Sequence, residues 1–302
     1  MRYDISLTIE YEYDHASDHA RNLLHLLPLN LPGRQEVIAS LLSADPVPDE
    51  RWDGTDFFGN AATWISYNEP IDSISLTLKA QAVRLPPPPQ MDLSAGLDRL
   101  GSEIAAVQGI GPDAPHHFLG TSPRVVPAPE MTAFARERIA GCSSALEAVL
   151  AIGRALHAEM AFDAEATDVA TPPAEAFAQR RGVCQDFTHV MIACLRGVGI
   201  PAGYVSGFLR TIPPPGQKRL EGADAMHAWV RAWCGGETGW IEFDPTNDTV
   251  AGDGHIVVAY GRDYSDVSPV RGTLRSAGGH DSKHFVDVAP LGTGDQTDGM
   301  RP

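Results

Sequence analysis

The sequence predicts an α+β protein, in which an N-terminal all-β, sandwich-like domain precedes a domain of helices followed by antiparallel strands. Three observations support this fold class. Apolar and polar residues alternate along the first part of the chain, helical spacing replaces that alternation after a run of prolines, and strand-like segments return after the helices. Helices followed by sequential strands favour an α+β arrangement over alternating βαβ units.

The N-terminal domain is expected over residues 1–88. In "DISLTIEYEY" the residues at every second position from Ile5 are apolar or aromatic, which is typical of a half-buried strand. "FFGNAATWISY" offers a Gly-Asn turn before a second strand, and "IDSISLTLKAQAV" alternates again. The run "RLPPPPQ" cannot continue a strand ladder, because proline has no N–H to donate, so it marks the boundary.

The second domain is expected over 89–275, with a helical lead-in at 97–160 and a core at 144–272. Ser144 and Glu147 fit a capping box at the start of one helix, and a further helix is expected at 183–198. Strands follow in "AGYVSGFL", "HAWVRAW" and "GWIEFDP". Residues 276–302 form a weakly patterned tail with at most one strand, in "HFVDV".

Composition excludes several classes of partner. The formal net charge of −16 repels nucleic acids and anionic membranes. The start "MRYDISLTIEYEYD" carries charges where a signal peptide needs an apolar run, and no apolar stretch is long enough to span a bilayer. A cytoplasmic protein with free thiols is therefore expected, since its cysteines show no paired spacing: Cys142, Cys184, Cys194 and Cys234.

Cys184 is the cysteine placed for chemistry, because it lies in the first turn of the helix expected at 183–198. Unpaired N–H groups and the helix dipole favour negative charge there, and the thiolate is the reactive form of cysteine. Helical rotation puts Cys184 at the edge of the apolar stripe, and Cys194 in the middle of it as a structural residue. His189 is a poor base for Cys184 and is expected to be solvated or to contact a loop. It shares the opposite face with Gln185, Asp186 and Arg196.

A base and an orienting carboxylate are expected from a hairpin in "MHAWVRAWCGGETGWIEFDPTND". If Trp233 pairs with Trp240, the antiparallel register places Arg231 opposite Glu242 as an attractive pair. His227 and Asp244 then become diagonal neighbours on one face of the sheet, near the point where Pro245 ends the strand.

Each of these residues has an ordinary structural interpretation by itself: a partly buried histidine at 227 and a turn aspartate at 244. Together with a helix-start cysteine they predict a nucleophilic site. Cys184 would attack an acyl carbon, His227 would accept and return the proton, and Asp244 would fix the imidazole tautomer. Trp229 is expected in the hairpin core, with shielding of the His227–Asp244 bond as the alternative.

Three sequence blocks resemble the transglutaminase-like superfamily of cysteine enzymes, in its bacterial branch with an N-terminal β domain that includes candidate cysteine proteases. They are "RRGVCQDFTHVMIACLRGVGIPAGYVSGFL", "AMHAWVRAW" and "GWIEFDPTND", and "WDGTDFFGN" resembles the accessory β domain. The resemblance covers nearly the whole chain. It assigns the nucleophile to Cys184, the base to His227 and the orienting role to Asp244.

The resemblance also implies a papain-like core, with the nucleophile helix packed on an antiparallel sheet. It implies hydrolysis or acyl transfer at a peptide or protein amide bond through a thioester, without an organic cofactor. The backbone N–H of Cys184 is expected in the oxyanion hole, with Gln185 and Trp229 as further candidates for substrate or oxyanion contacts. The loop at 210–226 is expected beside the cleft, where it would shape substrate choice.

Two alternatives stay open from the sequence. The chain could be a non-catalytic protein-binding or assembly module on the same fold, although such modules usually lose one of the three site residues. Histidine pairs at His15 and His19, and at His280 and His284, have the spacing of helical metal ligands. Neither segment has a helical pattern or a cysteine nearby, so no metal site is expected.

Overall fold

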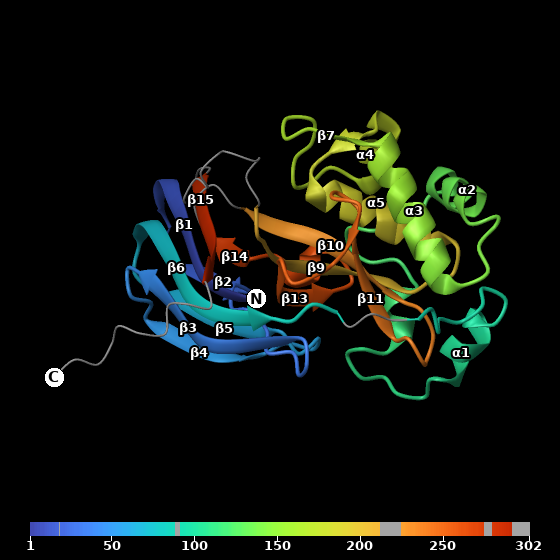
Figure 1. The fold of residues 1–302 in the computed structure, drawn as a ribbon. Helices are drawn as coiled ribbons and strands as arrows, with labels where there is room; N and C mark the ends of the chain where they lie inside the picture. Colours follow the sequence, from blue (N-terminus) through green and yellow to red (C-terminus); the bar gives the residue numbers. More distant parts are fainter. Residues whose placement is uncertain (18, 88–90, 212–224, 275–279, 292–302) are drawn as a thin grey trace, which may run out of the picture.

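The computed structural model describes all residues except 18, 88–90, 212–224, 275–279 and 292–302. The N-terminal region contains two four-stranded antiparallel sheets (Figure 1). In one sheet the strand order is β15-β1-β6-β3, with bounds His280–Leu291, Arg2–Ser17, Ile71–Arg84 and Gln35–Asp45. In the other it is β14-β2-β5-β4, with bounds Val270–Leu274, Ala20–Leu24, Ala61–Tyr67 and Glu50–Thr55.

The alternation seen in the sequence creates the core of this region. Ile5, Leu7 and Ile9 of β1 are fully buried, and they belong to one apolar cluster with Ile65 and Tyr67 of β5 in the opposite sheet. Because alternate side chains of a strand point to one face, each sheet contributes one apolar face to the shared interior. A β-sandwich results.

Both ends of the chain build this sandwich, so the region is not limited to residues 1–88. β14 pairs with β2 and β15 pairs with β1, although the sequence assigned β14 to the second domain and β15 to a weakly patterned tail. The run of prolines divides the sequence, but β14 and β15, which come after it, return to the N-terminal region. Pairing between β1 and β15 joins residues that are 267 to 289 positions apart in the sequence, and no local pattern carries that information.

The second region holds a five-stranded antiparallel sheet in the order β12-β11-β10-β9-β13. Its strands are Thr249–Val250, Trp240–Asp244, Met226–Trp233, Ala202–Leu209 and His255–Gly261. Short strands β7 (Ala161–Phe162) and β8 (Arg181–Gly182) pair in parallel. The helices are α1 (Leu100–Ala106), the 3₁₀ helix η1 (Pro115–Phe118), α2 (Pro129–Arg138), α3 (Ala145–Glu159), α4 (Pro173–Gln179), α5 (Cys184–Gly197) and α6 (Tyr264–Val267).

Helix α5 is the centre of this region. It packs on β10 and β9 on one side and against α2, α3 and α4 on the other, where Figure 1 shows the helices grouped beside the sheet. The predicted helix at 183–198 and the Ser144 cap, which accepts a hydrogen bond from Glu147 N at 3.2 Å, are confirmed. The antiparallel sheet with a helix packed on it is also as predicted.

The predicted polar face of α5 is wrong for three residues. Asp186, His189 and Arg196 are 1%, 2% and 5% exposed, because elements cover the helix on all sides. Arg196 is satisfied by the carbonyls of Ala202, Gly120 and Arg262 and by Ser122 Oγ. Helical periodicity identifies the apolar stripe but not which polar residues neighbouring elements cover with their own hydrogen-bonding groups.

A small apolar cluster joins the two regions and includes residues of the five-stranded sheet. Leu29 contacts a group of residues from that sheet that includes Trp229, Val257 and Tyr260. Asn60 adds two hydrogen bonds to the backbone of Tyr260, at 2.7 and 2.8 Å. Among the described residues no helix is long and apolar enough to cross a membrane. The cytoplasmic location stays a prediction.

Candidate active site

The turn before α5 fixes the position of Cys184. Gly182 has a φ of +154°, and a Cβ there would lie 2.4 Å from Asp186 Oδ2. The absence of a side chain lets the Asp186 carboxylate fold back and accept hydrogen bonds from Val183 N at 2.8 Å and Thr167 Oγ1 at 2.6 Å. Cys184 is therefore the first residue of the helix, where backbone N–H groups have no intrahelical acceptor.

The hairpin that carries the histidine and the aspartate has the register expected from the sequence. Trp233 pairs with Trp240 and Arg231 with Glu242. The attractive Arg231–Glu242 contact is replaced, however: Arg231 pairs with Asp113 at 3.0 Å, and Glu242 pairs with Arg34 and, at 3.6 Å, with Arg84. The alignment was correct although each charged residue of the pair has another ionic partner.

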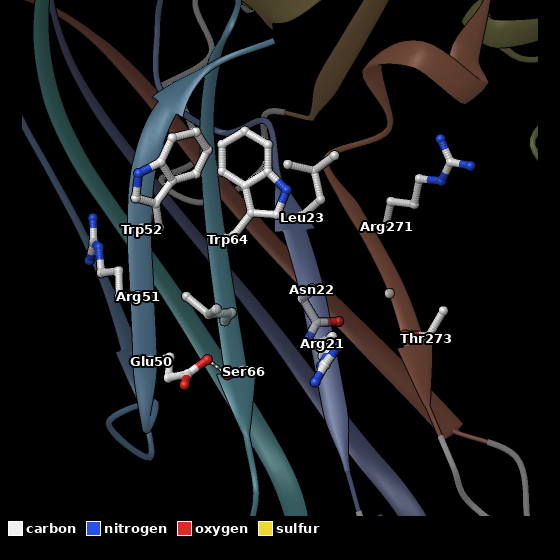
Figure 2. Close-up of a pocket in the computed structure, with 12 residues that line it drawn as sticks. Arg21, Asn22, Leu23, Glu50, Arg51, Trp52, Trp64, Ser66, Arg271 and Thr273 are labelled. Atoms are coloured by element: carbon white, nitrogen blue, oxygen red, sulfur yellow. Dashed lines mark hydrogen bonds between the residues drawn. The ribbon is translucent and has the colours of Figure 1, made fainter.

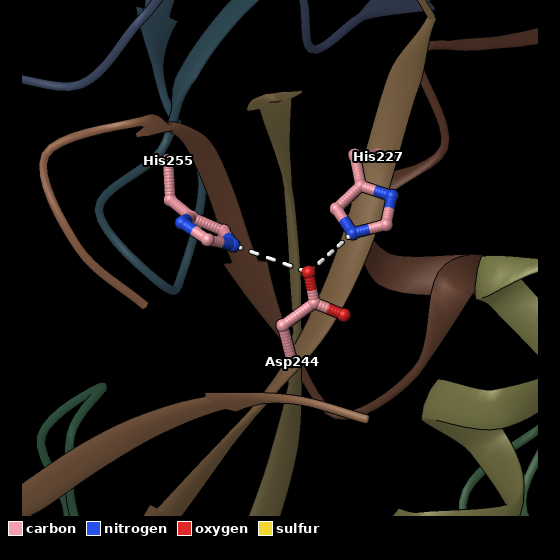
Figure 3. Close-up of side chains that lie close together, drawn as sticks. All are labelled: His227, Asp244 and His255. Carbon is pink, nitrogen blue, oxygen red and sulfur yellow. Dashed lines mark hydrogen bonds and ion pairs between the residues drawn. The ribbon is translucent and has the colours of Figure 1, made fainter. Parts of the chain in front are cut away.

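His227 and Asp244 are joined by a hydrogen bond of 2.7 Å between Nε2 and Oδ2 (Figure 3). Asp244 has no exposed surface. Its Oδ1 accepts from the backbone N–H groups of Thr246 and Asn247 at 2.9 and 3.2 Å, and Asn247 Nδ2 donates to Oδ2 at 2.7 Å. Burial opposes ionisation, but the hydrogen bonds from the histidines outweigh it and hold the pKa of Asp244 below its usual range.

A second histidine, which the sequence did not identify, binds the same carboxylate oxygen. His255 Nε2 lies 3.1 Å from Asp244 Oδ2, opposite His227 (Figure 3). The backbone N–H of Gly252 donates to His255 Nδ1 at 3.2 Å, so the proton of a neutral His255 is on Nε2 and is donated to Asp244. His255 lies on β13, and only the sheet order, which places β13 beside β9, brings it to the site.

The imidazole of His227 also interacts with the side chain of Cys184. Since Nε2 faces Asp244, Nδ1 is the nitrogen left for the thiol. Burial lowers the pKa of His227, but the hydrogen bonds with Asp244 and Cys184 outweigh it and raise the pKa well above its usual range. An imidazolium beside a thiol favours the thiolate.

The other three cysteines lie in environments that suppress the thiolate. Burial raises the pKa of Cys194 and of Cys234 to about 12. Burial and the nearby Glu147 raise the pKa of Cys142 as well. The prediction that Cys194 is a buried structural residue is confirmed by its 0% exposure.

The two candidates for substrate or oxyanion contacts, Gln185 and Trp229, lie in different surroundings. Gln185 is partly exposed beside Cys184, and its amide donates to the carbonyl of Val169 at 3.2 Å. Trp229 is fully buried, and its indole N–H donates to Glu242 at 2.9 Å. With no exposed surface it cannot touch a substrate, and its place in an apolar cluster confirms the predicted core position. The centre of its ring lies 6.1 Å from that of His227, and shielding of the His227–Asp244 bond stays a prediction. The segment 212–224, most of the loop expected beside the cleft, lies outside the described residues.

His227, Asp244 and His255 also form the one group of possible metal ligands found among the described residues, with ligand atoms within 4.8 Å of one another. The hydrogen-bonding pattern does not fit a metal. Nε2 of each histidine donates a proton to Asp244, and a metal ligand needs that nitrogen's lone pair. The group is better described as one carboxylate held between two donors.

Comparison with known proteins gives the family. A family model for the transglutaminase-like superfamily matches residues 132–245, and one for the bacterial transglutaminase-like N-terminal region matches residues 3–83. An uncharacterized protein of Mycobacterium tuberculosis is 34% identical over 281 residues, which cover 90% of this chain and 87% of the relative. An uncharacterized protein of Mycobacterium leprae is 37% identical over 158 residues, 51% of this chain and 54% of that protein.

A solved structure has the same overall fold. The crystal structure of a candidate cysteine protease from Cytophaga hutchinsonii matches with a TM-score of 0.73 and 22% identity, covering 100% of this chain and 94% of that one. The arrangement of a sandwich followed by a helix-on-sheet core is therefore shared between proteins of low sequence identity. The chain belongs to the transglutaminase-like superfamily.

Proposed function

We propose that this protein is a cysteine-dependent enzyme that hydrolyses or transfers acyl groups at the amide bonds of peptides or proteins. The observation that carries the proposal is the 2.7 Å hydrogen bond between His227 and Asp244, supported by Cys184 in the first turn of α5 and by its electrostatic effect on His227. A thiol, a base and a carboxylate in this order are what nucleophilic acyl transfer requires.

In the proposed reaction the Cys184 thiolate attacks the carbonyl carbon, and the carbonyl electrons move onto oxygen. First-turn N–H groups of α5, that of Cys184 above all, would stabilise this oxyanion. The C–N bond then breaks while Nδ1 of the His227 imidazolium gives its proton to the leaving amine, which leaves a thioester. Water or an amine attacks the thioester, His227 takes the proton of that nucleophile, and the thiolate leaves.

Asp244 keeps His227 in the tautomer that this sequence of proton transfers needs. Its Oδ2 accepts from Nε2–H in both the neutral and the protonated ring, so Nδ1 carries the exchangeable proton. His255 and Asn247 hold the carboxylate in place, and we assign them positioning roles. No cofactor is assigned in this scheme.

Selective alkylation tests the proposal. Iodoacetamide at pH 6, followed by peptide mapping, should label Cys184 well ahead of the other three cysteines, whose pKa values are raised by burial. Cys184→Ala should remove this label and also abolish trapping of an acyl-enzyme from a peptide pool. Equal or absent labelling at Cys184 would count against an enzyme. The non-catalytic alternative wins if Cys184→Ala leaves cellular function intact and disruption of the β-sandwich abolishes it.

A further inference from the structure

The outer face of the sheet β14-β2-β5-β4 carries a groove of about 690 Å³. None of the residues that line it takes part in the proposed reaction. Strand register arranges its side chains in two rows that cross all four strands. The first row is Arg271, Leu23, Trp64 and Trp52. The second is Thr273, Arg21, Ser66 and Glu50. The volume is in the range of ligand-binding pockets.

Two tryptophans form an aromatic surface in the first row. The rings of Trp52 and Trp64 lie 4.3 Å apart at 47°, and Figure 2 shows them side by side on neighbouring strands. Trp52 is 59% exposed, which is unusual for an indole. A Cβ on Gly54 would lie 2.6 Å from the Trp52 ring, so the glycine is what allows this ring to lie along β4.

Charged and polar groups surround the aromatic surface. Arg21 is exposed, and its guanidinium has no hydrogen bond or ion pair to any residue that the structure describes. Arg271 is also exposed and makes one hydrogen bond, to the carbonyl of Ser265 at 3.3 Å. Glu50 accepts from Ser66 Oγ at 3.1 Å (Figure 2). Two cations with free donors against one carboxylate make the groove locally positive on a protein of net charge −16.

We propose that this groove binds an oligosaccharide that carries carboxylate groups. Aromatic rings offer a flat surface for the C–H face of a sugar ring, and side chains with donors and acceptors serve its hydroxyls. The two arginines provide donors in the geometry that binds carboxylates. The rows cross four strands and therefore span about 14 Å, which accommodates a short chain of sugars.

The same surface is poorly suited to an extended peptide. Peptides that bind sheets usually add to an exposed edge, where free backbone groups provide the hydrogen bonds. The groove is centred on β2 and β5, and both strands are paired on both sides within the sheet. Only side chains are available to a ligand on this face, and side-chain contacts are sufficient to bind a sugar.

Calorimetric titration of the full-length protein tests the proposal. The probes are tetramers of galacturonate, of mannuronate and of hyaluronan, with neutral cellotetraose and tetra-aspartate as comparisons. At least one uronide is expected to bind more tightly than about 1 mM, and added salt should weaken this binding. Cellotetraose should bind at least about fivefold more weakly, because it lacks the carboxylates.

Variants with matched controls assign the binding to the groove. Trp52→Ala should weaken uronide binding about tenfold and Arg21→Gln about fivefold. The controls are Leu41→Ala, which removes another exposed apolar side chain from the opposite sheet, and Arg136→Gln, which makes the same charge change on α2; both should stay within about twofold. Circular dichroism of each variant checks that the fold is kept.

Three results would overturn the proposal. The first is no binding by any of the three uronides, and the second is equal binding of cellotetraose. The third is uronide binding that Trp52→Ala leaves unchanged. Tighter binding of tetra-aspartate than of every uronide would replace the sugar by an acidic peptide. None of these readings depends on Cys184, so they stand apart from the test of the proposed enzyme.

Discussion

Two histidines of the second region, one on β10 and one on α5, have opposite properties because their surroundings differ. His227, on β10, meets a buried carboxylate and a thiol, and its pKa is raised. His189, on α5 itself, is 2% exposed, and its Nε2 accepts the backbone N–H of Tyr264 at 3.2 Å. Burial lowers the pKa of His189 to about 4, so that ring is neutral at physiological pH.

The difference shows that burial alone does not decide the charge of a histidine. Both rings lose solvent, which favours the neutral form. His227 also gains acceptors for its N–H groups, which favour the charged form, whereas His189 must keep a lone pair free for a backbone donor. The partner of the second nitrogen therefore separates a residue suited to proton transfer from one suited to packing.

The largest expected effect comes from removing the ring that carries the charge. His227→Gln should slow alkylation of Cys184 at pH 6 by up to about 300-fold, because a thiol without an imidazolium partner has a pKa of about 8.5 and only about one molecule in 300 is thiolate at this pH. His189→Gln is the matched control, since a glutamine oxygen can accept from Tyr264 N, and it should change the rate less than about threefold. Equal losses in both variants would mean that α5 is disturbed as a whole.

The second largest effect is on folding stability, which should depend on pH in opposite directions for the two histidines. An unfolded chain protonates His189 near its ordinary pKa of about 6.5, before the folded protein does, so stability falls as pH drops from about 6.5 to about 4. The loss should approach about 3 kcal/mol. His227 acts in the opposite sense and in another window: its contribution is complete below about pH 6.5 and is lost as pH rises through its raised pKa.

Urea unfolding at pH 7, 6, 5 and 4 measures this effect in the wild type and in His189→Gln. The variant lacks the titrating ring, so its stability should fall less over the same range, and the difference between the two curves isolates His189. Parallel curves would contradict the assignment. Asp244 does not interfere in this window, because its lowered pKa confines its loss of stability to more acidic solution.

The smallest expected effect concerns the second donor to Asp244. His255→Phe removes one hydrogen bond to the carboxylate and should slow alkylation of Cys184 at pH 6 about tenfold. His255→Gln can still donate from its amide, and it should recover much of the rate. If both variants slow alkylation equally, His255 acts through packing; if neither slows it, the carboxylate is held in place without His255.

Much of the site could be predicted because its residues lie in short segments with strong local patterns. The aromatic and charged residues of the β10–β11 hairpin fixed the register, and the register brings His227 beside Asp244. The glycine before Cys184 and the apolar stripe after it marked the start of α5. The catalytic roles of these three residues stay predictions, and the experiments above test them.

Other features depended on segments that are distant in the sequence. His255 reaches Asp244 only because β13 pairs with β9, and Asn247 was missed although the turn after Asp244 lies next to a predicted site residue. Arg231 and Glu242 form ion pairs with residues outside the hairpin, Asp113 and Arg34. The two tryptophans of the groove are neighbours through pairing of β4 with β5, and Arg21 and Arg271 join them through β2 and β14.

The sequence by itself determined the main strands and helices and the register of the hairpin, whereas the choice of His227 over the nearer His189 as partner of Cys184 stays a prediction. These follow from periodicity and short-range pairing, in which each residue's neighbours are set by the chain. The tertiary structure alone decided which polar residues of α5 are buried, which second histidine holds Asp244, and how both chain ends complete the sandwich. Those outcomes depend on which surfaces meet after folding, and packing supplies hydrogen-bond partners that no local pattern records.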